Sequence, residues 1–323
     1  MKIGVTGGAG YIAVHVILDL LQEGHEVTVL DNLSTGNPVN IMPESSQYHF
    51  IEGDTSRPDS LERFFKAEPE VIFHFAASKA AGESMTDPIK YSANNIRGTL
   101  TLVEMMIRRG CRYLIFSSSA AVYGEPQYTP IDEKHPLVPI NYYGFTKYAI
   151  EQDLQWMSRL TDFRFAALRY FNAAGYDIQG RVKGAETQTL NLLPIVMETA
   201  SGKRGVLEIY GNDYDTRDGT CIRDYIHIND LARAHVLSMH YLVKTGKDIT
   251  VNLGSEKGLT VLEMLESARR ITGKEIPSKI SPRRAGDPPA LIASSKLARE
   301  LLGWEAKYST ADLLVESTWR LYK

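Results

Sequence analysis

Residues 2–13 read Lys2-Ile3-Gly4-Val5-Thr6-Gly7-Gly8-Ala9-Gly10-Tyr11-Ile12-Ala13, a short apolar run followed at once by clustered glycines. The run over residues 2–6 predicts a buried β-strand, and apolar residues at helical spacing over residues 11–22 predict a helix. Glycines between a strand and a helix allow a tight turn that gathers backbone N–H groups at the amino end of the helix. The stretch therefore predicts a strand–turn–helix unit of a parallel α/β sheet.

The same alternation continues through the first half of the chain. Further strands are predicted at residues 26–30, 48–52, 71–75, 113–117 and 163–171, and helices at residues 60–66, at 87–109 and from 143 onward. This pattern predicts an α/β fold, a Rossmann-type doubly wound parallel sheet, with a smaller C-terminal α/β substrate domain. We expect a first domain over residues 1–171, rejoined at about residues 231–254 where a helix-then-strand pattern returns, and a mainly substrate-binding domain over residues 172–323.

Composition and charge narrow the class of protein. Of the 323 residues, 43% are hydrophobic and 23% charged, and the formal net charge is −3, so a basic surplus for binding nucleic acid is lacking. No apolar run approaches the length needed to span a bilayer, and the chain opens on a strand pattern, not on a cleaved leader. Cys111 and Cys221 show no metal-ligand spacing and fit a reducing compartment. We expect a cytoplasmic protein with no nucleic-acid, membrane or metal partner.

A carboxylate follows the second predicted strand. Asp31 stands where it can accept hydrogen bonds from the hydroxyls of an adenine ribose, and its charge would repel a 2′-phosphate. The glycine turn before residue 11 suits a pyrophosphate at the helix amino end. Asp54 follows the third strand, and the small residues of 75–79 follow the fourth. Together these features predict a dinucleotide site that takes NAD in preference to NADP.

Tyr143 and Lys147 have the spacing Tyr-x-x-x-Lys, downstream of three serines at residues 117–119. In a helix the two side chains lie one turn apart on the same face, so the ammonium can stand near the phenol. A nearby positive charge, helped by an oxidised nicotinamide ring, favours phenolate and brings the tyrosine pKa towards the working pH, as a general base requires. We therefore predict that Tyr143 is the base of a hydride-transfer reaction.

Nine segments carry a resemblance to a known family. They are residues 7–13, 31–36, 74–77, 79–84, 94–95, 117–124, 143–147, 169–172 and 223–227. On these segments the chain resembles the extended short-chain dehydrogenase/reductase family, and within it the UDP-galactose (UDP-glucose) 4-epimerases, over nearly its whole length. The resemblance implies an NAD-dependent isomerase of nucleotide-sugar metabolism that inverts C4 of a UDP-sugar through a 4-keto intermediate.

The resemblance also implies a set of site residues. The catalytic residues would be Ser119, Tyr143 and Lys147. The cofactor-binding residues would be Gly7, Gly10, Tyr11, Ile12, Asp31, Asn32, Asp54, Phe75, Ala76, Ala77, Lys79, Asn94, Ser117, Tyr143, Lys147 and Phe171. The substrate-binding residues would be Lys79, Ser119, Tyr143, Asn172, Asn191, Leu192, Arg223, Tyr225, Arg284, Asp287 and Leu291. Arginines in this set suit a diphosphate, which they bind through charge-assisted hydrogen bonds.

Several readings of the substrate stay open. UDP-glucose and UDP-galactose are the first expectation, and UDP-GlcNAc and UDP-GalNAc are a second, because Leu291 matches a position whose size sets access to the sugar pocket in this family. A pentose or uronate 4-epimerase is an alternative, as is a non-catalytic NAD-binding regulator. Ala120 and Ala121 stand where related dehydratases place an acidic pair. The resemblance further implies a homodimer, formed through the helices at residues 87–109 and from 143.

Overall fold

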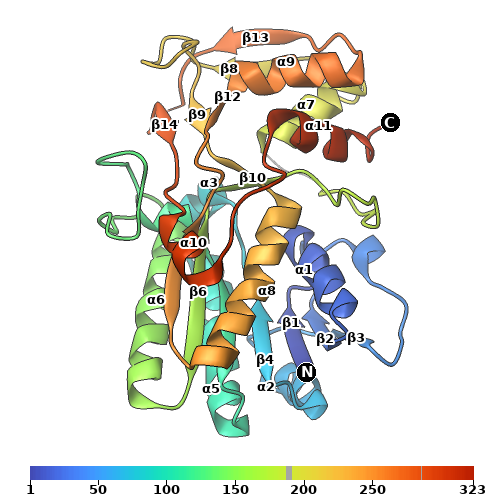
Figure 1. Ribbon diagram of the computed structural model, residues 1–323, viewed down its shortest axis with the longest axis vertical. Helices are drawn as coiled ribbons and strands as arrows, with labels where there is room; N and C mark the ends of the chain where they lie inside the picture. The colour runs from blue at the N-terminus through green and yellow to red at the C-terminus, as the bar shows by residue number, and fades with distance from the viewer. Residues whose placement is uncertain (187–190, 285) are drawn as a thin grey trace.

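Parallel strands form a seven-stranded central sheet in the computed structural model, which describes residues 1–186, 191–284 and 286–323 (Figure 1). The strands are β1 (Lys2–Thr6), β2 (Glu26–Asp31), β3 (Tyr48–Glu52), β4 (Val71–His74), β5 (Tyr113–Ser119), β6 (Arg164–Tyr170) and β11 (Ile249–Leu253). Their order is β11-β6-β5-β4-β1-β2-β3, and every neighbouring pair is parallel. The predicted doubly wound sheet is confirmed. Its order reverses between β1 and β4, the place where such sheets bind ligands.

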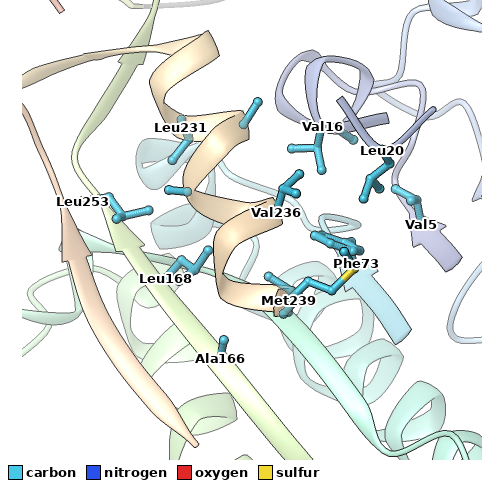
Figure 2. Close-up of a cluster of buried hydrophobic side chains, with 14 of the residues drawn as sticks. Val5, Val16, Leu20, Phe73, Ala166, Leu168, Leu231, Val236, Met239 and Leu253 are labelled. Carbon is cyan, nitrogen blue, oxygen red and sulfur yellow. The ribbon is translucent and has the colours of Figure 1, made fainter. Parts of the chain in front are cut away.

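Helices cover both faces of this sheet. One face carries α1 (Tyr11–Gln22), α8 (Ile228–Thr245) and α10 (Lys296–Leu302), and the other carries α2 (Pro58–Phe64), α5 (Gly98–Arg109) and α6 (Tyr142–Leu160). Figure 2 shows Val236 and Met239 of α8 lying beside Leu20 of α1 and Phe73 of β4. Burying one such side chain contributes roughly 1.5–3 kcal/mol. A helix from late in the chain thus shares one core with the first strand–helix unit.

The helix predicted over residues 87–109 is interrupted. It consists of α4 (Pro88–Tyr91), a π-helical turn η3 (Ser92–Arg97) and α5, preceded by α3 (Ala81–Thr86). Short 3₁₀ turns occur at η1 (Pro38–Asn40), η2 (Phe65–Ala67) and η4 (Ala120–Val122). A π turn inserts an extra residue into the helical ladder and redirects the side chains around it. Periodicity alone does not reveal such an insertion.

The remaining elements gather at the carboxyl end of the sheet, in the upper part of Figure 1. Strand β7 (Asn172–Ala174) pairs with β10 (Tyr225–His227), β9 (Ile222–Arg223) lies between β12 (Leu259–Thr260) and β14 (Ala290–Leu291), and β8 (Leu207–Tyr210) pairs with β13 (Ser278–Ser281). Helices α7 (Leu192–Ala200), α9 (Val261–Thr272) and α11 (Ala311–Trp319) share a separate apolar core with them. In the ranges that the structure describes, no helix is long and apolar enough to cross a bilayer.

Candidate active site

The turn between β1 and α1 is built from glycines for a geometric reason. Gly7 has φ +73°, and a Cβ on it would meet the backbone nitrogen of Ala76 at 2.6 Å. The Gly10 N–H donates to the Gly7 carbonyl at 3.0 Å, and Gly10 begins α1 without a side-chain cap. The first-turn N–H groups of α1 therefore face the end of the sheet where β4 also ends, and this arrangement suits a phosphate.

Asp31 closes strand β2 next to this turn. Its carboxylate accepts the N–H of Ala9 at 3.0 Å and the N–H of Leu33 at 2.7 Å. Burial raises the pKa of Asp31, while these two hydrogen bonds lower it. Asn32 donates to the Asp54 carboxylate at 2.7 Å, so the ends of β2 and β3 are joined at the same edge. The structure thus brings these three predicted cofactor residues together beside the glycine turn.

The segment after β4 runs along the other side of the turn. Phe75 packs its ring 5.0 Å from the ring of His235, and the backbone of Ala76 touches Gly7. Farther along, Asn94 donates to the Ser78 hydroxyl at 3.1 Å, which ties the π turn to this segment. Small residues here allow the backbone to approach the glycine turn closely.

Helix α6 presents Tyr143 and Lys147 toward the end of β5. Asn141 caps the helix by accepting the Gly144 N–H at 2.8 Å. The Lys147 side chain is buried, its Nζ donates to the Ser117 carbonyl at 2.7 Å, and it lies 5.9 Å from the centre of the Tyr143 ring. Ser119 forms a side-chain hydrogen bond with Tyr143. The three residues predicted to be catalytic are therefore neighbours.

The electrostatics of this group qualify the sequence-based expectation. Burial raises the pKa of Tyr143, and the hydrogen bond from Ser119 lowers it less than burial raises it. Burial also lowers the pKa of Lys147 to about 7, although the charge of Glu151 raises it. Lys147 alone does not bring the Tyr143 pKa down, because desolvation of the phenol raises it and the pKa of the lysine is itself lowered; the expected lowering depends on the nicotinamide charge as well.

A cavity of about 520 Å³ lies in the C-terminal part of the chain. Among the predicted substrate residues, those that line it are Asn172, Asn191, Leu192, Arg223, Tyr225, Arg284 and Asp287. Lys79, Ser119, Tyr143 and Leu291 lie outside its lining. Leu291 is nevertheless the register partner of Arg223 across β14 and β9, and it packs near Phe171. Lys79 forms an ion pair with Glu186, which does line the cavity.

The cavity holds both signs of charge. Arg223 forms an ion pair with Asp287 and donates to the Ile222 carbonyl at 2.7 Å. The guanidinium of Arg284 lies 4.0 Å from the centre of the Tyr210 ring. A flat guanidinium over an aromatic face is well placed to bind a planar or anionic group. The arrangement suits a nucleotide with a diphosphate.

Sequence reasoning missed some lining residues. Tyr210, Cys221 and Glu186 line the cavity, yet none was selected from the sequence. Strand β8 alternates buried and half-buried residues, so its period-two pattern places Glu208 and Tyr210 on the same face. That alternation was the available signal for Tyr210. Glu186 had no local signal, because its partner Lys79 is 107 residues away.

Comparisons with known proteins extend over the whole chain. Residues 3–254 match the model of the NAD dependent epimerase/dehydratase family. The UDP-glucose 4-epimerase of Halalkalibacterium halodurans is 45% identical over 324 residues, covering 100% of this chain and 96% of the relative. The structure of UDP-glucose 4-epimerase from Brucella ovis in complex with NAD is 42% identical with a TM-score of 0.95, covering 99% of this chain and 98% of that one. The UDP-Glc/GlcNAc 4-epimerase from Campylobacter jejuni is 38% identical with a TM-score of 0.88, covering 99% and 98%.

Proposed function

The chain belongs to the NAD dependent epimerase/dehydratase family, and from this premise we propose that it is an NAD-dependent isomerase that inverts C4 of a UDP-sugar, a UDP-glucose 4-epimerase. The observation that carries the proposal is the meeting of Ser119, Tyr143 and Lys147 in a chain whose cavity holds Arg223 and Arg284. The chain thus provides both proton-transfer groups and diphosphate-binding groups, and we place the sugar between them.

The residues of the glycine turn and of Asp31 fit NAD. A cradle without side chains at Gly7 and Gly10 leads into the amino end of α1, and the Asp31 carboxylate lies at the end of β2. When bound, NAD⁺ supplies an acceptor that takes the hydrogen from C4 and returns it to the opposite face. We assign the binding of the cofactor to the residues predicted for it, from Gly7 to Phe171.

Within this proposal Tyr143 takes the proton of the sugar 4-hydroxyl and later returns it. Ser119, hydrogen-bonded to Tyr143, also hydrogen-bonds the 4-oxygen of the sugar and holds the phenol in place. Lys147 holds its ammonium behind the phenol, at the Ser117 carbonyl. Arg223 and Arg284 anchor the diphosphate, so that the 4-keto sugar can turn about that anchor and present its other face. The cycle leaves no net oxidation.

Two parts of the chain divide the work in this proposal. Residues 1–171, with the return at about 231–254, bind the cofactor, and residues 172–323 mainly bind the nucleotide sugar. Support comes from β11, which joins the large sheet beside β6, and from the cavity lining, which is drawn largely from residues after Asn172. The division of labour would be tested by separate titrations of NAD and of UDP with variants on each side.

We further propose a homodimer in the cytoplasm. Large apolar side chains are exposed on α4 and α6, namely Ile89 at 75%, Trp156 at 57% and Leu160 at 73%. Large apolar side chains exposed on these helices are candidates for protein contacts. Cys111 and Cys221 are both free and buried, which fits a reducing compartment. Sedimentation of the wild type and of Trp156→Glu would test the dimer, since the charge should shift the protein to monomer.

The sugar specificity that we propose includes N-acetylhexosamines as well as hexoses. Leu291 and Phe171 pack against the same small apolar cluster of Val122, Tyr123 and Ile131, and a leucine at this position occupies less space than a tyrosine would. One relative of this chain is named for both UDP-Glc and UDP-GlcNAc, and this favours the broader range. The pentose alternative has support of the same kind, because a structural neighbour named UDP-glucose 4-epimerase is crystallised with formylated UDP-arabinopyranose.

The decisive experiment uses the purified protein without added cofactor. It is incubated with UDP-galactose and, separately, with UDP-N-acetylgalactosamine, and the anomeric signals of the sugars are followed by proton NMR. An epimerase that retains NAD and is restricted to hexoses should convert UDP-galactose alone. An epimerase with a wider sugar pocket should convert both substrates. Conversion of neither, even with added NAD⁺, would contradict the proposed function.

A further inference from the structure

A buried ion pair lies directly behind the candidate catalytic side chains. The side chain of Glu151 on α6 is 0% exposed and that of Arg169 on β6 is 4% exposed. Arg169 Nε donates to both carboxylate oxygens at 3.0 and 3.2 Å, and Nη2 donates to one of them at 2.5 Å. Buried pairs of this kind are often no more stabilising than apolar side chains of the same size. Fold stability alone is therefore a weak explanation for this pair.

The contacts of Glu151 lead to the reaction centre from two sides. Glu151 lies one helical turn after Lys147, and its carboxylate accepts the Ser118 hydroxyl at 2.5 Å. Ser118 lies between Ser117 and Ser119. The Ser117 carbonyl accepts a hydrogen bond from Lys147 Nζ, and Ser119 is hydrogen-bonded to Tyr143. Glu151 thus holds the end of β5 and the lysine of α6 in a fixed relation.

The pair is in turn anchored away from the site. Arg169 Nη1 donates to the Tyr123 hydroxyl at 3.0 Å, and that hydroxyl donates to Asn252 on β11 at 2.6 Å. Asn252 Nδ2 donates to the Ile131 carbonyl at 3.0 Å. Each polar group has a partner, so the network holds a single arrangement. Asn252, at the far end of this network, belongs to β11, the last strand of the central sheet in chain order.

We infer that Glu151, oriented by Arg169, is a positioning residue that keeps Lys147 and the Ser117–Ser119 strand end in register for the proton transfer at Tyr143. The inference rests on the proposed function. Glu151 touches neither substrate nor cofactor in this account, and acts through Ser118 and through its charge on Lys147.

The charges around Lys147 give the inference a measurable consequence. Its titratable neighbours are Tyr143 and Glu151 on the same helix and His74 from β4, and Tyr170 from β6 is close to Tyr143. Burial keeps Tyr170 protonated and His74 neutral, because it raises the first pKa and lowers the second. Glu151 is the neighbour whose charge raises the pKa of Lys147 against burial. Removal of that charge should deprotonate the lysine at lower pH.

The test is Glu151→Gln, with kcat measured against pH and with bound NAD and unfolding midpoint recorded. We expect kcat to fall about 10- to 100-fold at neutral pH with KM nearly unchanged, since misplacement by about 1 Å can cost on the order of 10²-fold. The alkaline limb of the kcat profile should move to lower pH. Asp153→Asn is the matched control, because it removes the same charge from the same helix without contacting Arg169, and its profile should match the wild type.

A second variant separates positioning from stability. Glu151→Gln combined with Arg169→Met removes both buried charges, so the unfolding midpoint should recover while the alkaline limb stays displaced. Recovery of turnover together with the midpoint, or an unmoved limb in Glu151→Gln, would overturn the inference while leaving the proposed function intact. Absence of any turnover by the wild-type chain would instead overturn the proposed function, and the inference with it.

Discussion

Tyr143 is a phenol that the surrounding chain keeps protonated. Burial raises its pKa, and Lys147 has a pKa of about 7, so near neutrality this lysine carries only part of its charge. A general base at this position therefore needs a further positive charge close to the phenol, and oxidised nicotinamide is the group that would supply it. This dependence would couple proton removal to the oxidised state of the cofactor.

The first prediction concerns Tyr143→Phe. The ring stays and only the hydroxyl is lost, so the fold and the bound NAD should remain, while kcat should fall by about 10²- to 10⁴-fold, the usual contribution of a positioned acid or base. Turnover of UDP-galactose followed by NMR, with NAD content measured on the same sample, checks this. Tyr142→Phe, one residue earlier, is the control and should keep most of its activity. Activity near the wild-type level in Tyr143→Phe would show that another group is the base.

Residue spacing identified the tyrosine, lysine and serine, but not the acidic residues around them. Tyr143 and Lys147 are four residues apart, so one helix brings them together and the sequence displays the pattern. Glu151 meets Arg169 from another element, and Glu186 meets Lys79 across 107 residues. Such pairs depend on how strands and loops are stacked, and no local periodicity encodes them.

A second prediction follows from the Lys79–Glu186 ion pair. Glu186 places a negative charge in the lining of the cavity proposed for a diphosphate. It also forms an ion pair with the ammonium group of Lys79, which is then less available to the substrate. Glu186→Gln should therefore lower KM for UDP-galactose by about three- to tenfold, since a charge interaction near a protein surface is worth on the order of 1 kcal/mol or more. Steady-state kinetics at low and high salt would measure it, with Glu316→Gln as an exposed control. An unchanged or higher KM would refute the prediction.

At the scale of elements, the strand–turn–helix unit at the start of the chain could be predicted in full from the sequence. The predicted helix over residues 11–22 matches α1, and the predicted strand over residues 2–6 matches β1. The long helix over residues 87–109 was predicted without its π turn, because its apolar side chains keep a nearly helical period on both sides of Ser92–Arg97. The C-terminal strands were not predicted individually, since several are two or three residues long.

The turn itself gives the third prediction. Gly7→Ala should lose bound NAD and lower the unfolding midpoint, because a Cβ would meet the Ala76 nitrogen at 2.6 Å in addition to the strain of φ +73°. Gly110→Ala is a matched control, with φ +72° and nothing within 4 Å of its Cβ, so it should show only the strain, about 1–2 kcal/mol. Nucleotide released on denaturation and urea unfolding measure both effects. Equal NAD content in the two variants would contradict the proposed cradle.

At the scale of the whole molecule, one core joins distant parts of the chain. Strand β11 and helix α8 complete the sheet and its front layer, although they lie after most of the residues of the cavity in the sequence. The sequence showed a returning helix-then-strand pattern near residues 231–254, but not which edge of the sheet it joins. Register and neighbour choice depend on the complete set of packed faces, which a single sequence does not display.

Buried histidines make this shared core sensitive to acid, and this is the fourth prediction. Burial lowers the pKa of His15 and His235 to about 4 and that of His74 and His227 to about 3. Free histidine titrates near 6.5, so below that pH the unfolded chain binds more protons than the folded one. The contribution of these neutral histidines is complete above about pH 6.5 and is lost as pH falls towards their folded values.

Buried carboxyls oppose this trend, because burial raises the pKa of Asp19, Asp31, Glu133, Asp153, Asp224 and Asp230. Burial raises the pKa of Asp19 to about 6, so the folded chain gains protons there between about pH 6 and the ordinary carboxyl range. Four histidines should outweigh them, and the free energy of unfolding should fall steadily from pH 7 to pH 4.5. Urea unfolding across this range measures it. His235→Leu should flatten the slope, because it removes one of the four groups that bind extra protons in the unfolded chain. Among the described residues His235 Nε2 has no hydrogen-bond partner, and Nδ1 bonds the Leu231 carbonyl. A slope unchanged in that variant would place the acid sensitivity elsewhere in the core.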